Sequence, residues 1–162
     1  MSQSGTILAI GLTGFNGIVD EIVSLDKPSF NELVETRISL ELKIVRLAAK
    51  RRTETDLNKI KEALKAFKDK ISVGEDYLEE DLLFHLAIAK ASKNSTMVSL
   101  MLLLKPPILS TYERDAVCEG DKVISEIAKH ENIYLAIESK DVEQATKMMN
   151  EHFYKLTKHI EN

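Results

Sequence analysis

The stretch Asp81-Leu82-Leu83-Phe84-His85 predicts both a helix and half of a candidate metal site. Asp81 and His85 stand four residues apart in a run of helical periodicity, so their side chains project from the same face of the helix. A carboxylate and an imidazole on adjacent turns are suitable ligands for a transition metal ion. The rest of the fold must therefore bring further ligands to this face.

Two distant histidines supply the other half. His130 and His152 are 22 residues apart, and the turn signal Ser139-Lys140-Asp141 lies near their midpoint. If antiparallel helices flank this turn, each histidine lies roughly ten residues from it, about 15 Å along its own helix. Three helices would then bring one carboxylate and three imidazoles to one level, a ligand set that suits zinc, nickel or manganese. The predicted ligands are Asp81, His85, His130 and His152.

The rest of the chain has the pattern of helices. From residue 28 onward, apolar residues recur at steps of three and four, and capping signals begin new segments at Thr53 and Asp141. Pro106-Pro107 is expected to kink or stop the fourth helix. No alternating strand pattern appears after residue 30. The sequence therefore predicts an all-α fold, an antiparallel bundle of six to seven helices.

Composition limits the class of protein. The 162 residues, of which 44% are hydrophobic and 30% charged, suffice for one domain with a substantial core. A net charge of −4 gives no basic footprint, so this chain alone is not expected to bind nucleic acid. The single cysteine, Cys118, excludes an internal disulfide and indicates a reducing compartment, for which the cytoplasm is the simplest choice.

Residues 1–27 differ from the helical remainder, residues 28–162, and are predicted to be a separate N-terminal segment. Gly5-Thr6-Ile7-Leu8-Ala9 has the composition of a short strand, and a flexible tail is the alternative. The apolar run Ile7–Val23 is interrupted by three glycines and carries two acidic residues, and no basic region precedes it. It is predicted to be neither a membrane span nor a signal peptide.

The three histidines allow a second interpretation, in which each is a core residue satisfied by an ordinary hydrogen bond. However, three of the four histidines in the chain occupy apolar seams. Burying an imidazole without a partner costs about 1 to 3 kcal/mol, which a bundle has no reason to accept unless a bound ion compensates. Spacing alone leaves both interpretations open.

Arg37 and Glu41 form an i,i+4 pair close to the inward stripe of the first long helix. One interpretation is a surface ion pair worth a few tenths of a kcal/mol. In the other, Arg37 enters the interior to bind an anion, because its planar fork fits a carboxylate. Periodicity alone favours the surface pair.

An ordered set of motifs resembles the FCD ligand-sensing domain of GntR-family bacterial transcription regulators. The resemblance covers roughly residues 30–160. The motifs are Glu35-Thr36-Arg37 followed by Glu41 and Leu47-Ala48-Ala49, Asp81-x-x-x-His85 with Phe84, Ala91-Ser92-Lys93-Asn94, Lys129-His130 with Ile133, and Asp141 to Ala145 leading to Met149 and His152.

This resemblance implies a helical bundle whose cavity holds a small organic acid beside a divalent metal ion. The family's metal ligands match Asp81, His85, His130 and His152, and its effector-binding arginine matches Arg37. The family also implies a homodimer that contacts DNA only through a winged helix-turn-helix domain, for which this chain has no room. Gly5-Thr6-Ile7-Leu8-Ala9 resembles the closing strand of such a wing.

The predicted function is therefore effector binding and dimerisation in a transcription regulator, without enzymatic activity. The main alternative is a helical metallohydrolase or lyase acting on a small carboxylate, since a metal with open positions can activate water. The sequence offers no clear general base beside the ligands, which weighs against this alternative. A third class is a structural bundle in which the metal only stabilises the fold.

Overall fold

Ser29 begins the first described helix of the chain. The computed structural model describes residues 29–111 and 121–160, and in these ranges it contains helices and no strand. The helices are α2 (Phe30–Arg51), α3 (Glu54–Ser72), α4 (Leu78–Ala91), α5 (Ser95–Thr111), α6 (Asp121–Glu138) and α7 (Val142–Ile160). The predicted all-α class is confirmed. The proposed N-terminal segment 1–27 and Cys118 lie outside the described residues.

Local hydrogen bonds set the predicted helix ends. A capping box begins α3, where the Thr53 side chain accepts from the Asp56 N–H and the Asp56 carboxylate accepts from the Thr53 N–H. Gly74 follows the end of that helix with φ +71°, a left-handed conformation that glycine adopts without strain. The Asp141 carboxylate accepts the N–H of Gln144 at 2.9 Å and so caps α7. These short-range interactions explain why the boundaries were predictable.

Pro106-Pro107 does not stop α5, which continues through both prolines to Thr111. Of the two predicted outcomes, a kink or a stop, the stop is therefore wrong, and the kink stays a prediction. A proline removes one N–H donor but keeps a helical φ, so a helix that packs against its neighbours can continue through it. Such packing is available here, because α5 lies against α2 and α4.

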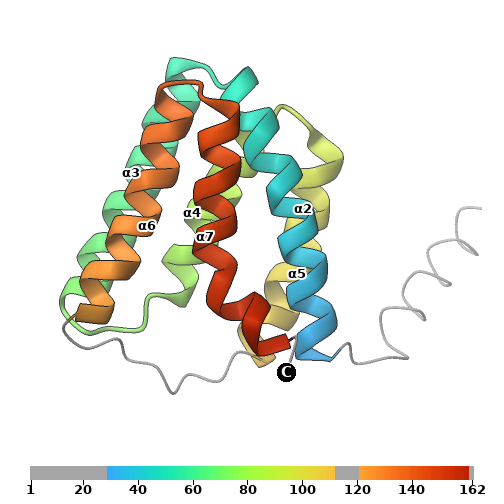
Figure 1. Cartoon of the computed structure of the whole chain (residues 1–162), viewed down its shortest axis with the longest axis vertical. Coiled ribbons are helices and arrows are strands. Elements are labelled where there is room, and N and C mark those ends of the chain that lie inside the picture. Colours follow the sequence, from blue (N-terminus) through green and yellow to red (C-terminus); the bar gives the residue numbers. More distant parts are fainter. Residues whose placement is uncertain (1–28, 112–120, 161–162) are drawn as a thin grey trace, which may run out of the picture.

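The bundle packs α2 against α7, α4 and α5, whereas α3 lies against α4 and α6, and α6 against α7 (Figure 1). The fully buried aromatic residues Phe67, Phe84 and Phe153 come from α3, α4 and α7. Four helices, α2, α4, α6 and α7, also direct polar side chains into this core. Among the described helices, none combines the length and the apolar character needed to cross a bilayer.

Candidate metal centre

The four predicted ligands lie together inside the bundle. Two come from α4, one from α6 and one from α7, and one ligand atom of each lies within 4.8 Å of the others. We call this group the four-residue cluster: Asp81, His85, His130 and His152. The helices that carry these ligands share neighbours. Helix α3 packs against both α4 and α6, helix α2 packs against both α4 and α7, and α6 packs against α7. The role of the four residues as metal ligands stays a prediction.

His130 is held on both edges of its ring. Its Nδ1 donates to the backbone oxygen of Glu126 at 2.8 Å, and its Nε2 lies 2.8 Å from Asp81 Oδ1. The ring stacks on Phe67, with centroids 4.0 Å apart. A carboxylate oxygen and an imidazole nitrogen that face each other need a proton or a cation between them. With Nδ1 already donating, the Nε2 edge is suited to a metal ion.

Two ring nitrogens in the cluster have no hydrogen-bond partner. Among the described residues, the buried side-chain atoms without a partner are His85 Nε2 and His152 Nδ1. His85 Nε2 lies 3.7 Å from Asp81 Oδ1, so it faces the centre of the cluster. Leaving a buried polar atom unsatisfied costs about 1 to 3 kcal/mol. A cation at the centre would satisfy His85 Nε2, so these residues fit a divalent metal.

The charge states of the cluster also suit a metal. Burial raises the pKa of Asp81, but the interactions with His85, His130 and Arg37 outweigh it, so this pKa lies well below its usual value. Burial and the neighbouring imidazoles lower the pKa of His152 well below its ordinary 6.5. At neutral pH the cluster therefore offers an ionised carboxylate and a neutral His152, which are the forms that bind metal.

Arg37 lies in the interior, with only 4% of its surface exposed. Its Nε donates to Glu41 Oε1 at 2.6 Å, and its Nη2 donates to Asp81 Oδ2 at 3.3 Å. Its guanidinium carbon lies 5.2 Å from the centre of the Phe153 ring. The surface ion pair favoured by periodicity is therefore wrong. Because α2 packs against four other helices, α4, α5, α6 and α7, this i,i+4 pair is buried.

Glu41 is a member of the site that the sequence analysis missed. The i,i+4 spacing indicates only a pair with Arg37, yet the second oxygen of Glu41, Oε2, bonds Nδ1 of His85. Burial raises the pKa of Glu41, but the interactions with His85 and Arg37 outweigh it and lower the pKa, so the carboxyl stays ionised. The available signal was the position of Glu41 one turn after Arg37, on the same inward face.

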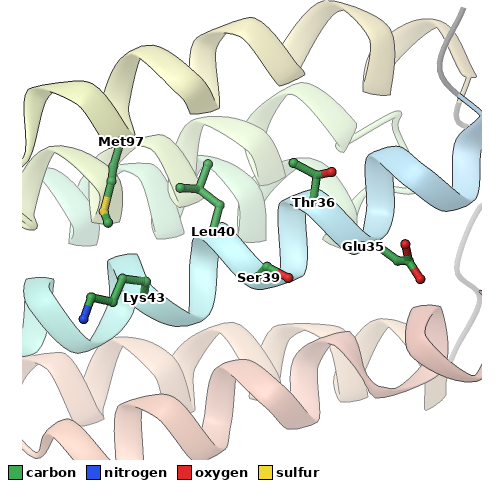
Figure 2. A pocket seen from close by; sticks show the side chains of 6 residues that line it. All are labelled: Glu35, Thr36, Ser39, Leu40, Lys43 and Met97. Carbon is green, nitrogen blue, oxygen red and sulfur yellow. The ribbon is translucent and has the colours of Figure 1, made fainter.

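A separate depression of about 590 Å³ lies on the outer face of the bundle, between α2 and α5. Figure 2 shows its lining: Glu35, Thr36, Ser39, Leu40 and Lys43 of α2, and Met97 of α5. We call it the α2–α5 groove. It shares no residue with the four-residue cluster. The expected effector cavity beside the metal therefore stays a prediction.

Comparison with known proteins agrees with this architecture. The chain is 33% identical over 132 residues to the HTH-type transcriptional regulator LutR of Bacillus subtilis strain 168, covering 79% of this chain and 60% of LutR. It is 28% identical over 125 residues to the Uxu operon regulator of Haemophilus influenzae, covering 75% of this chain and 47% of that protein. The chain therefore spans roughly half of the length of these regulators.

Two solved structures share the fold. Streptococcus agalactiae GntR superposes with a TM-score of 0.69 and 25% identity, covering 80% of this chain and 58% of that chain. E. coli McbR/YncC superposes with a TM-score of 0.66 and 22% identity, covering 80% of this chain and 66% of that chain. The family model of the FCD domain matches residues 32–155. The chain therefore belongs to the FCD domain family of GntR-type transcription regulators.

Proposed function

We propose that this effector-binding domain uses a divalent transition metal ion, held by the four-residue cluster, to bind a small organic acid. The observation that carries the proposal is a group of one carboxylate and three imidazoles inside the bundle, in which two buried ring nitrogens lack hydrogen-bond partners. Imidazole and carboxylate ligands suit zinc, nickel and manganese. The metal, when bound, would supply a positive centre for an anionic effector.

Different residues of the chain would bind the metal ion and the effector. Asp81 and the three imidazoles would hold the ion, which would supply Lewis-acid attraction for an effector carboxylate. Arg37, whose guanidinium already bonds one ligand of the cluster, would neutralise that carboxylate. To do so, it would exchange part of its contact with Asp81 for the effector.

We further propose that the chain works in the cytoplasm as a homodimer. Three exposed leucines of α5, Leu100, Leu102 and Leu103, have 44%, 48% and 59% of their surface accessible, which favours burial against another subunit. In the α2–α5 groove, Glu35 and Lys43 lie toward opposite ends of the α2 edge (Figure 2). A two-fold axis across the groove would set each Glu35 against the Lys43 of the other copy.

Effector binding would then change the placement of two protomers and so the spacing of attached DNA-binding domains. DNA contact is assigned to a winged helix-turn-helix domain, since the net charge of −4 gives this chain no overall excess of positive charge to attract phosphates. The relatives are named regulators rather than enzymes, so the metallohydrolase or lyase alternative is not adopted.

Elemental analysis and calorimetry test the proposal together. The purified chain should hold about one divalent ion per protomer and, with that ion fixed, bind one member of a panel of di- and hydroxycarboxylates saturably. A chain without metal after reloading with zinc, nickel or manganese would overturn the metal site. Metal binding without binding of any acid would favour the structural alternative, in which the ion only stabilises the bundle.

A further inference from the structure

Glu41 of α2 is buried among charged partners, with a side-chain exposure of 1%. Its Oε1 accepts from Arg37 Nε at 2.6 Å, and its Oε2 bonds His85 Nδ1. The two carboxylate oxygens of Glu41 therefore have different partners. Neither oxygen is among the ligand atoms that meet in the four-residue cluster. This placement argues against Glu41 as a fifth ligand.

A carboxylate on one ring nitrogen decides which nitrogen remains for a metal. A neutral imidazole carries one proton, and a carboxylate at Nδ1 keeps the proton on Nδ1. The lone pair then lies on Nε2. In His85 this is the nitrogen that faces Asp81 Oδ1 at 3.7 Å and has no hydrogen-bond partner. The geometry around Glu41 thus prepares His85 to coordinate through Nε2.

We propose that Glu41 is the positioning residue of the metal centre, because it orients His85 toward the ion and Arg37 toward Asp81 with one carboxylate. The inference rests on the proposed metal site and adds a function for a residue outside the ligand set. Positioning partners of this kind fix the tautomer and the ring orientation of a metal-bound histidine.

The carboxylate of Glu41 also connects the proposed metal site to Arg37, the residue proposed to bind the acid. Arg37 Nη2 reaches Asp81 Oδ2 at 3.3 Å while its Nε stays on Glu41. An organic acid that draws the guanidinium toward itself would therefore alter hydrogen bonds to Glu41 and Asp81, both of which contact His85. Metal and acid should each change the affinity of the other by the same factor.

The decisive variant is Glu41→Gln, which preserves side-chain shape. A glutamine amide has one acceptor oxygen and one donor nitrogen, so Arg37 or His85 must lose its acceptor. Affinity of the full chain for Zn²⁺, measured by competition with a chelator, should fall about 10- to 100-fold. The ¹⁵N spectrum of the metal-free variant should show the His85 ring changing from Nδ1–H to a mixture of tautomers.

Glu126→Gln is the matched control. Glu126 holds His130 through its backbone oxygen, while its side chain pairs with Lys129, so this substitution leaves the contact to His130 in place. The affinity of the Glu126→Gln variant for Zn²⁺ should equal that of the wild type. A similar loss in both variants would show a general charge effect and overturn the specific role of Glu41.

Unchanged Zn²⁺ affinity and an unchanged His85 tautomer in Glu41→Gln would also overturn the proposal. The wild-type spectrum gives an independent answer if the variant fails to fold, since an Nε2–H tautomer in metal-free His85 contradicts orientation by Glu41. If the wild type binds no metal ion, the proposed metal function fails, whereas the tautomer still shows whether Glu41 orients the ring.

Discussion

Two histidines of the cluster differ in how well the protein holds them without an ion. His130 has partners on both nitrogens and stacks on Phe67, whereas His152 has a buried nitrogen without a partner. His152→Ala should therefore lower metal occupancy with little loss of metal-free stability. His130→Ala should lower both, because it also removes a hydrogen bond to Asp81.

Elemental analysis and thermal unfolding, each with zinc and with a chelator, check this difference. A ligand at 100 times its Kd stabilises the folded state by about 2.7 kcal/mol, so the metal-dependent rise in Tm should shrink in both variants. Full metal retention in both would contradict the ligand assignment.

Arg37→Lys tests whether the buried guanidinium serves the acid. A lysine keeps the positive charge but loses the planar fork, so binding of a confirmed acid should weaken while the fold remains. Arg37→Ala should cost more, about 2 to 5 kcal/mol in acid binding, and it should also destabilise the chain because Glu41 and Asp81 lose a buried cation.

Calorimetric titration at fixed metal measures these effects. Arg46→Lys on the same helix is the control, since Arg46 makes an exposed contact with Thr146. Equal acid affinity in the wild type and both Arg37 variants would mean that the metal alone anchors the acid.

The neutral state of His152 predicts a pH dependence of stability in the metal-free chain. Its pKa is lowered by burial and by His130 and His85, so below about pH 6.5 the unfolded chain binds a proton that the folded chain does not. Stability should therefore fall as pH decreases from neutral, by at most about 1.4 kcal/mol per pH unit for this group.

Urea unfolding at pH 7.5 and pH 5.5 with a chelator measures this slope, and His152→Asn should reduce it. Metal affinity should fall over the same interval, because protons compete for the imidazole ligands. A flat profile for both stability and metal binding would contradict the assigned protonation state.

At the scale of helices, Asp56 joins the beginning of α3 to the turn between α4 and α5. Its carboxylate caps Thr53 and accepts from Lys93 Nζ at 2.7 Å. Burial raises the pKa of Asp56, but the bonds from Lys93 and Thr53 outweigh it and lower the pKa to about 2. The contribution of Asp56 to the free energy of unfolding is present above about pH 4 and is lost as the pH falls toward 2.

Asp56→Ala should therefore destabilise the chain by about 1 to 2 kcal/mol at pH 7, since it removes half of a capping box. Glu62→Ala, at an exposed position of the same helix, should change stability by less than about 0.5 kcal/mol. Denaturant unfolding compares the two. Equal small effects would show that the cap and the Lys93 pair contribute little.

At the scale of the whole molecule, the exposed leucines of α5 make the proposed homodimer testable. Leu103→Glu should convert the dimer to a monomer, because a charge in a buried subunit contact is costly. Leu135→Glu on α6, at a similarly exposed leucine, is the control and should leave the mass unchanged. Light scattering after size-exclusion chromatography measures the mass, and a dimeric Leu103→Glu would place the interface elsewhere.

The sequence by itself determined the helices, the caps at Thr53 and Asp141, and the inward position of the histidines. Capping boxes such as Thr53 with Asp56 act within one turn, and apolar seams mark the buried face of each helix without reference to its neighbours. The distance of His130 and His152 from a shared turn was also local information. For this reason the composition of the four-residue cluster was predictable.

Only the tertiary structure decided the surroundings of that cluster. An i,i+4 pair such as Arg37 and Glu41 has the same spacing on an exposed and on a buried face, and burial depends on how many helices cover α2. The bond from Glu41 to His85 joins residues 44 positions apart, so no local pattern contains it. Likewise, α5 continues through Pro106-Pro107 in a bundle where α2 and α4 pack against it. Helix propensities describe single residues and do not include such packing between distant segments.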